Sequence, residues 1–302
     1  MNSEDSGEES INDSAPSRDM DLTWTLNVKG VDRTFQGPLV MGILNVTPDS
    51  FADGGQYVAP GPALERIGEM VEDGAAIIDI GGESTRPGAE PVSEDEELKR
   101  VLPVLEQAIP EYPDTYFSVD TTKLKVAHQA LYAGAHIIND VSGLTYEPKI
   151  AGLCADYGAA YVLMHKQGTP KDMQDNPAYE DVVADIKHFF IKQMALTEEW
   201  RLNRDSIILD PGIGFGKTLE HNLELLRRLR EFGELGRPLL IGASRKSMIS
   251  KILDGRTVEE RLAGTIAVHY HALLEGAKIL RVHDVRDAAD SVEIYKRIVQ
   301  SD

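Results

Sequence analysis

Residues 39–44, LVMGIL, are the first of eight short apolar runs that decide the fold of this 302-residue chain. The others, in chain order, are AAIIDI (75–80), TYFSV (115–119), AHIIN (135–139), AYVLM (160–164), SIILD (206–210), LLIGA (239–243) and AKILRV (277–282). The runs do not alternate between apolar and polar residues. This pattern is typical of parallel strands that are buried on both faces.

Segments with helical periodicity separate the runs. Apolar residues three and four positions apart recur over 64–71 and 182–190. Glycines that follow a helical pattern and precede a strand mark helix ends, and they are Gly74, Gly134, Gly158 and Gly276. Eight strand–helix units in about 265 residues fit a closed barrel better than an open doubly wound sheet. We therefore predict an α/β fold, a single (β/α)8 TIM barrel.

The segment before the first run predicts two further features. TLNVKGVDRTFQG (25–37) has two alternating runs around Lys29-Gly30, which indicates an N-terminal β-hairpin. Residues 1–21 are rich in Ser, Asp and Glu and lack the basic start and apolar core of a secretory signal. We expect a disordered acidic tail over 1–21 and one barrel domain over 22–302.

Composition restricts the class of protein. The 31 basic and 50 acidic residues give a net charge of −19, so we expect no nucleic-acid partner. No apolar run approaches the roughly 20 residues of a membrane span, so we expect no membrane partner. The single cysteine, Cys154, cannot form an internal disulfide, which fits a reducing, cytoplasmic location.

Polar residues follow every predicted strand. In such a barrel, function gathers at the C-terminal ends of the strands. The strand ends carry Asn45, Glu83 to Arg86, Asp120 to Lys123, Asn139 and Asp140, His165 and Lys166, Asp210, Ser244 to Ser247, and Arg281 to Asp284. This mixture of carboxamides, carboxylates and cations predicts an enzyme that acts on a polar substrate.

The strand ends fall into two groups of opposite character. Cations gathered at one mouth of an acidic protein indicate an anionic substrate group such as phosphate. They are Arg86, Lys246, Arg281 and His283, with Lys217, Arg245 and Lys251 close in sequence. The other group suits a heterocycle that has N–H donors and carbonyl acceptors. It consists of Asp120, Asp210 and Asn139.

Loops and isolated motifs refine this picture. NVTPDSFADGG (45–55) and GGESTRPGAEPVS (81–93) are long, glycine-rich loops that we expect to close on substrate. GIGFGKT (212–218) ends like a phosphate-binding loop, but the required first glycine falls at Pro211, which argues against ATP hydrolysis. His269, His271 and Cys154 are expected to be packing or surface residues. Lys246 leaves a Schiff-base aldolase open as an alternative.

Eight segments together resemble the dihydropteroate synthase family, folate-biosynthesis enzymes that sulfonamides inhibit. They are MGILNVTPDSFADGG, IIDIGGESTRPGA, SVDTTK, IINDVSG, LMHKQGTP, ILDPGIGFGKT, IGASRKSMI and RVHDV, in the family's order over nearly all of 37–302. The combination of NVTPDSF, GESTRPG and SRKS is highly specific. The resemblance implies a transferase that condenses 6-hydroxymethyl-7,8-dihydropterin pyrophosphate with p-aminobenzoate, with Mg²⁺, to give 7,8-dihydropteroate and pyrophosphate.

The resemblance also implies site residues. For the pterin they are Asp120, Asn139, Met164, Asp210 and Lys246, of which Asp120, Asp210 and Lys246 are also catalytic. For pyrophosphate they are Asn45, Arg281 and His283, and Asn45 also contacts the Mg²⁺. For p-aminobenzoate they are Phe51, Thr85, Arg86, Pro87, Phe215 and Ser247. Homodimers of barrels are expected on the same ground.

This chemistry has a physical logic. If the C–O bond to pyrophosphate breaks before the amine attacks, positive charge develops on the pterin methylene. Asp120 and Asp210 would stabilise that charge, and Mg²⁺, Arg281 and His283 would stabilise the leaving group. A methyltetrahydrofolate-dependent methyltransferase would share the pterin contacts but has no need for NVTPDSF, STRPG and SRKS. A non-catalytic pterin-binding protein is the other alternative.

Overall fold

Eight parallel strands form the central sheet of the computed structural model, which describes residues 22–47, 60–84, 90–169, 173 and 177–300. Their spatial order is β8-β7-β6-β5-β4-β3-β10-β9. All eight predicted strands are confirmed. They are β3 (Leu39–Asn45), β4 (Ile77–Gly81), β5 (Tyr116–Asp120), β6 (Ile137–Asp140), β7 (Ala160–Met164), β8 (Ile207–Asp210), β9 (Leu240–Ile241) and β10 (Ile279–Val282).

The two ends of this sheet nearly meet, which makes it a barrel. Leu209 of β8 forms a parallel bridge with Leu239, the residue before β9. The amide of Leu209 also donates to the carbonyl of Pro238 at 2.9 Å. The predicted barrel is therefore confirmed. Between β8 and β9 the described strands are joined by a single bridge.

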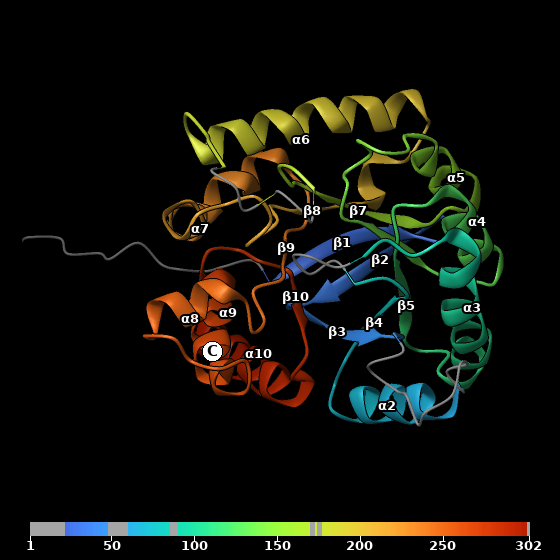
Figure 1. Ribbon diagram of the computed structural model, residues 1–302, viewed down its shortest axis with the longest axis horizontal. Helices are drawn as coiled ribbons and strands as arrows, with labels where there is room; N and C mark the ends of the chain where they lie inside the picture. The colour runs from blue at the N-terminus through green and yellow to red at the C-terminus, as the bar shows by residue number, and fades with distance from the viewer. Residues whose placement is uncertain (1–21, 48–59, 85–89, 170–172, 174–176, 301–302) are drawn as a thin grey trace, which may run out of the picture.

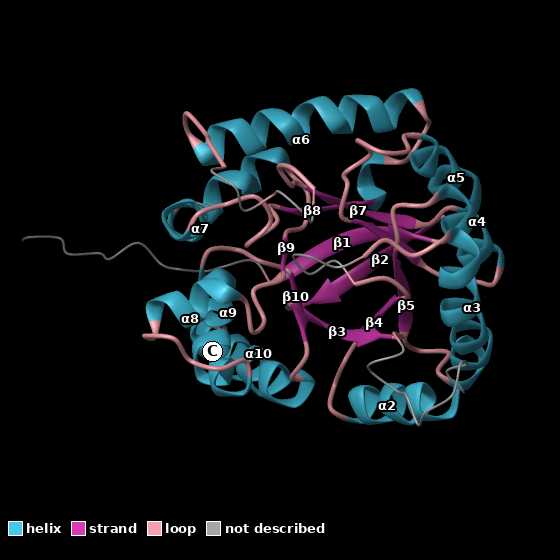
Figure 2. Cartoon of the chain, viewed as in Figure 1, coloured by secondary structure: helices cyan, strands magenta, loops and turns pink. Residues whose placement is uncertain are grey.

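Helices cover the outer side of the sheet (Figures 1 and 2). They are α2 (Pro60–Glu72), α3 (Glu94–Glu111), α4 (Leu124–Tyr132), α5 (Lys149–Tyr157), α6 (Val182–Glu199), α7 (Leu219–Arg227), α8 (Ser247–Ile252), α9 (Leu262–Leu274) and α10 (Val285–Val299). The described connections also contain 3₁₀ turns: η1 (Arg204–Ser206) between α6 and β8, η2 (Leu229–Leu235) between α7 and β9, and η3 (Glu259–Arg261) between α8 and α9. The larger apolar cluster fills the space between sheet and helices, as amphipathic helices require.

The predicted hairpin is also present. β1 (Thr23–Val28) and β2 (Val31–Gln36) pair antiparallel with Val28 opposite Val31, so Lys29 and Gly30 form a two-residue turn. Their φ angles of 54° and 70° are in the left-handed region that such turns need.

The hairpin closes the N-terminal end of the barrel. Trp24, Leu26 and Val28 belong to a second apolar cluster with residues at or near the starts of the strands, among them Ile77 and Ile279. Apolar side chains therefore fill this end of the barrel, and the polar residues lie toward the opposite end.

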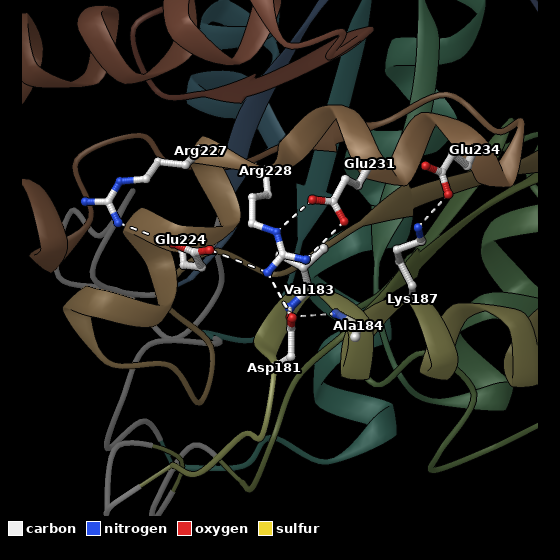
Figure 3. A network of polar contacts seen from close by, with 9 residues as sticks. All are labelled: Asp181, Val183, Ala184, Lys187, Glu224, Arg227, Arg228, Glu231 and Glu234. Atoms are coloured by element: carbon white, nitrogen blue, oxygen red, sulfur yellow. Dashed lines mark hydrogen bonds and ion pairs between the residues drawn. The ribbon is translucent and has the colours of Figure 1, made fainter.

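A cluster of charged side chains joins the start of α6 to α7 and η2 (Figure 3). Asp181 caps α6 by accepting hydrogen bonds from the amides of Val183 and Ala184, at 2.9 and 3.0 Å. Arg228, directly after α7, donates to Asp181 at 3.0 Å and to Glu231 of η2 at 2.7 Å. Helix α6 follows the β7 loop, and α7 follows the β8 loop. The cluster therefore links the two helices that follow these neighbouring loops.

Several smaller expectations have a clear outcome. Cys154 is buried in the core, and His269 is buried and accepts a hydrogen bond from the amide of Ala243 at 3.1 Å. His271 contacts the carbonyl of Leu226 at 2.9 Å. In the described ranges, no helix has the length and apolar character needed to cross a membrane. The expected acidic tail over 1–21 lies outside the described residues.

Candidate active site

Strand alternation places a layer of polar side chains directly above the second apolar cluster, which we call the apolar plug of the barrel. Residues two positions apart on a strand share a face. In four strands the polar residue comes two positions after a member of the plug: Asp79 after Ile77, Asn139 after Ile137, Asp210 after Ile208, and Arg281 after Ile279. These side chains therefore point into the barrel near its C-terminal rim, where Asp120 ends β5.

Arg281 joins two buried carboxylates in this layer. Its Nε donates to Oδ2 of Asp79 at 2.7 Å, and its Nη2 donates to Oδ2 of Asp120 at 2.9 Å. The same Asp79 oxygen accepts a hydrogen bond from Nδ2 of Asn139 at 2.9 Å. An arginine carries five N–H donors, so Arg281 retains donors beyond these two. The acidic and cationic groups inferred from the sequence are thus in direct contact.

Burial changes the acidity of the two predicted catalytic carboxylates. It raises the pKa of Asp120 to about 7, although Arg281 acts in the opposite direction. Negative charge on neighbouring Asp79 adds to the increase. Burial also raises the pKa of Asp210, against the opposing effect of Lys246. The charge of Asp120 in the free protein therefore changes near neutral pH.

Lys246 follows β9, the strand between β10 and β8, and lies against the loop that follows β8. Its ammonium donates to the carbonyl of Ile213 and lies 4.1 Å from the centre of the Phe215 ring, a cation–π contact. Loss of hydration lowers the pKa of Lys246 to about 7, although Asp210 acts against this. Asp210 itself accepts a hydrogen bond from the amide of Gly212 at 2.7 Å. Lys246, Phe215 and Asp210 are thus brought together.

The β8 loop GIGFG needs its alternate glycines. Gly212, Gly214 and Gly216 have φ angles of 69°, 82° and 63°. A Cβ on Gly212 would lie 2.0 Å from the carbonyl oxygen of His165, and one on Gly216 would lie 2.3 Å from that of Gln167. The loop therefore packs backbone to backbone against the β7 loop, which only glycine allows. This explains the motif without nucleotide binding.

Contacts with two other parts of the chain, the segment after β10 and helix α9, hold the SRKS segment. Arg245 has a φ of 57°, unusual for a residue with a side chain. Its guanidinium pairs with Asp284 after β10, and its amide donates to Oγ1 of Thr265 at 3.0 Å. Arg245 is therefore a structural clamp rather than a substrate-facing cation. Helix α8 begins at Ser247.

The remaining predicted residues are located as follows. Asn45 ends β3 opposite Gly81 of β4, and Met164 ends β7 and is buried. The ring nitrogen Nδ1 of His283 lies 3.0 Å from Oγ of Ser244. Among the described residues, no group of three or more His, Cys, Asp or Glu side chains could hold a metal ion. Outside the described residues are Phe51, Thr85, Arg86 and Pro87.

The role of Asp79 was not predicted from the sequence. It is fully buried and contacts both Arg281 and Asn139, two residues assigned to substrate. A signal was present, because Asp79 is the one charged residue within the apolar run AAIIDI. A carboxylate inside a buried strand needs partners, and these partners lie at the site.

A parallel barrel with carboxylates, an amide, a lysine and an arginine at one rim is typical of enzymes that bind a polar heterocycle. The family model described as "Pterin binding enzyme" matches residues 41–283. The dihydropteroate synthase of Synechocystis sp. is 49% identical over 255 residues, which cover 84% of this chain and 88% of the relative.

Solved structures of dihydropteroate synthases are also similar to this chain. The Yersinia pestis dihydropteroate synthase with a sulfonamide drug complex has a TM-score of 0.85 and 43% identity, over 91% of this chain and 99% of that one. The Xanthomonas albilineans enzyme in complex with 7,8-dihydropteroate has a TM-score of 0.81 and 37% identity, over 92% and 100% of the two chains. The chain is therefore a pterin-binding barrel enzyme. Within that class it belongs to the dihydropteroate synthase family.

Proposed function

We propose that this chain condenses 6-hydroxymethyl-7,8-dihydropterin pyrophosphate with p-aminobenzoate, releasing pyrophosphate. The observation that carries the proposal is the joined cluster of Asp79, Arg281 and Asp120 in a barrel of this family. It provides a buried carboxylate and a cation within one hydrogen bond of each other. A reaction that separates positive and negative charge needs both at one place.

The pterin lies, in this proposal, between the carboxylates and Lys246. Its N–H groups donate to Asp120 and Asp210, and its carbonyl accepts from Lys246, with Asn139 and Met164 completing the contacts. Asp120 and Asp210 are buried, so hydrogen bonds to them are protected from water. Discrimination against a heterocycle that lacks these donors is roughly 10⁴-fold for a buried polar site.

The same groups act in the chemical step. Breaking the C–O bond leaves positive charge on the pterin methylene, which the carboxylates of Asp120 and Asp210 stabilise. Arg281 and His283 bind the departing pyrophosphate. A charge-assisted hydrogen bond contributes about 1.5–3 kcal/mol, so several of them supply a large part of the barrier reduction. The neutral aromatic amine then attacks the methylene carbon, and the anilinium that forms releases its proton to the departing pyrophosphate or to water, so no general base on the protein is needed.

Magnesium fits this site as a companion of the substrate rather than as a resident ion. Mg²⁺ usually keeps several waters and takes one or two protein oxygens together with substrate phosphates. The amide oxygen of Asn45, half-buried at the end of β3, is a ligand of the right chemistry. When bound there with the pyrophosphate group, the ion would neutralise charge on the leaving group.

The p-aminobenzoate ring packs, in this proposal, against Phe215 and the aliphatic part of Lys246. Its carboxylate reaches Ser247 at the start of α8. Phe51, Thr85, Arg86 and Pro87 complete this pocket. Support comes from the contact of Phe215 with Lys246, which creates an aromatic wall beside the pterin-binding lysine. Sulfonamides would compete for the same pocket.

We also propose a cytoplasmic homodimer. Ile252 and Leu253 at the end of α8 and Ile294 and Ile298 on α10 are exposed apolar side chains, as a subunit contact requires. The single cysteine, Cys154, is unpaired and buried, which fits a reducing compartment. Light scattering of the purified protein at several concentrations tests the dimer.

Product formation tests the proposed reaction. Purified protein is given the pterin pyrophosphate, p-aminobenzoate and Mg²⁺, and each is omitted in turn. We expect dihydropteroate and pyrophosphate in equal amounts, only when all three are present. Tight pterin binding without product would instead favour a methyltransferase or a binding protein. Borohydride trapping of an imine on Lys246 would indicate an aldolase.

A further inference from the structure

Lys217 ends the β8 loop and is a fully enclosed cation, with 2% of its surface exposed. Its Nζ lies 3.0 Å from the carbonyl oxygens of Gly212 and Phe215 and 3.1 Å from Nδ1 of His165. The carbonyl oxygen of His165 is 3.4 Å away. The side chain thus turns back into its own loop, where the ammonium is surrounded by acceptors.

These acceptors suit a positive charge. An ammonium group has three donors and no lone pair, so Nδ1 of His165 must accept. Burial and the charge of Lys217 lower the pKa of His165 to about 2, which keeps that nitrogen unprotonated. Burial also lowers the pKa of Lys217 to about 7, with Asp210 acting in the opposite direction. The lysine is therefore protonated at slightly acidic pH.

The loop that surrounds this ammonium carries two contacts of the site. The carbonyl of Ile213 accepts a hydrogen bond from Lys246, and the ring of Phe215 lies against the ammonium group of Lys246. Both residues lie between Gly212 and Gly216, whose backbone bends bring the carbonyls of Gly212 and Phe215 to Lys217. Without the ammonium, the carbonyls of Gly212 and Phe215 would lose their hydrogen bonds from Lys217, and that of Gly212 would keep only the one from the amide of Phe215, at 3.1 Å.

We propose that Lys217 is a positioning residue for the condensation, a tethered ammonium ion that holds the GIGFG loop so that Phe215 and Lys246 form the p-aminobenzoate pocket. The proposal rests on the function proposed above. It assigns Lys217 no contact with substrate. Its N–H donors are required, because a side chain of similar volume without donors cannot satisfy the carbonyls.

Two variants separate charge from volume. Lys217→Met fills the space without a charge, whereas Lys217→Ala leaves room for a small amine. Dihydropteroate formation is measured at pH 6.5 with saturating pterin pyrophosphate and Mg²⁺ and varied p-aminobenzoate. We expect kcat/KM for p-aminobenzoate to fall roughly 10- to 100-fold in both variants, the scale of a misplaced binding group. Pterin affinity, measured without p-aminobenzoate, should change far less.

Chemical rescue is the decisive readout. Ammonium or methylammonium chloride should restore Lys217→Ala in a saturable manner, while sodium chloride at equal ionic strength should not. Lys217→Met and Phe215→Ala should show no rescue, because the first has no space and the second lacks the aromatic wall. The wild-type rate in the same assay reports separately on the proposed function.

The outcomes are distinct. Wild-type kinetics in Lys217→Met would overturn the proposal, because volume alone would then suffice. An amine-insensitive Lys217→Ala that folds, as judged by circular dichroism, would also overturn it. If Lys217→Ala does not fold, Lys217→Met decides: a defect confined to p-aminobenzoate supports the proposal, and an equal loss of pterin affinity contradicts it.

Discussion

Nη2 of Arg281 lies 2.9 Å from Oδ2 of Asp120, although 161 positions separate the two residues in the chain. The contact spans the C-terminal end of the barrel. A second hydrogen bond, from Nε of Arg281 to Asp79, fixes the orientation of the guanidinium. The free protein therefore already holds together the two groups that the proposed reaction uses, and both are charged above about pH 7. Little reorganisation is needed when charge develops on the substrate.

The pH dependence of kcat/KM for the pterin substrate should be bell-shaped, with its maximum near pH 7. Asp120, with its pKa raised to about 7, must be ionised, so the rate rises as pH approaches 7 from below. Lys246, with its pKa lowered to about 7, must be protonated, so the rate falls above that value. Steady-state rates between about pH 5.5 and 8.5 check this.

The substrate pyrophosphate titrates in the same range, so a control is needed. The Asp120→Asn variant has lower rates but should lose the acid limb that belongs to Asp120. A profile for the wild type that is flat across this range would contradict the assignment of both groups.

Asp120 should also make the free energy of unfolding fall between about pH 4 and 7. Its pKa is raised from 3.8 to about 7, so in this window the native state holds a proton that the unfolded chain releases. The native state then binds more protons, and stability decreases as pH rises. The Tm of Asp120→Asn relative to wild type should rise by a few degrees between pH 5 and pH 8.

Thermal unfolding followed by circular dichroism provides the measurement. Asp114→Asn, at an exposed position, is the matched control and should keep a constant difference from wild type. A constant difference for Asp120→Asn as well would mean that burial of its carboxylate has no energetic consequence.

Asp79 is predicted to orient Arg281 and Asn139 rather than to bind substrate. Replacing it with Ala removes one acceptor from both partners, so KM for the pterin substrate should rise roughly 10-fold, equivalent to about 1.4 kcal/mol. Ser118, its neighbour in register on β5, is the control, and Ser118→Ala should change KM little. Equal effects of the two substitutions would contradict a specific role for Asp79.

Gly212→Ala should be much more destabilising than Gly236→Ala. The two glycines have nearly equal φ angles, 69° and 68°, so the backbone strain of alanine is similar, about 1 kcal/mol or somewhat more. At Gly212 the new Cβ would also lie 2.0 Å from the carbonyl oxygen of His165, whereas nothing lies within 4 Å at Gly236. Urea unfolding of both variants measures the difference. Similar losses would show that the loops separate at little cost.

The barrel could be predicted from the sequence because burial leaves a direct trace in it. The runs LVMGIL and AYVLM are apolar throughout because both faces of each strand are covered, and the strands β3 and β7 coincide with them closely. The Lys29-Gly30 turn was similarly visible, since few residues accept its left-handed backbone.

The contacts of the site were less predictable, because they join side chains from distant strands. Arg281 and Asp79 are 202 positions apart, and no periodicity records which carboxylate an arginine reaches. From the sequence, we grouped Arg245 and Lys217 with the cations at the barrel mouth, because they lie close to them in the chain. Arg245 instead pairs with Asp284, and Lys217 turns into its own loop, because buried charges take the acceptors that the fold supplies.

The turnover of Asp120→Asn tests the central claim most directly, that this carboxylate stabilises charge on the pterin methylene. Single-turnover product formation and pterin affinity are measured on the same preparation. We predict that turnover falls roughly 100-fold or more, the usual effect of removing one electrostatic contact to a transition state, while pterin affinity falls far less. An unchanged turnover rate, or a loss that lies entirely in pterin binding, would contradict the account.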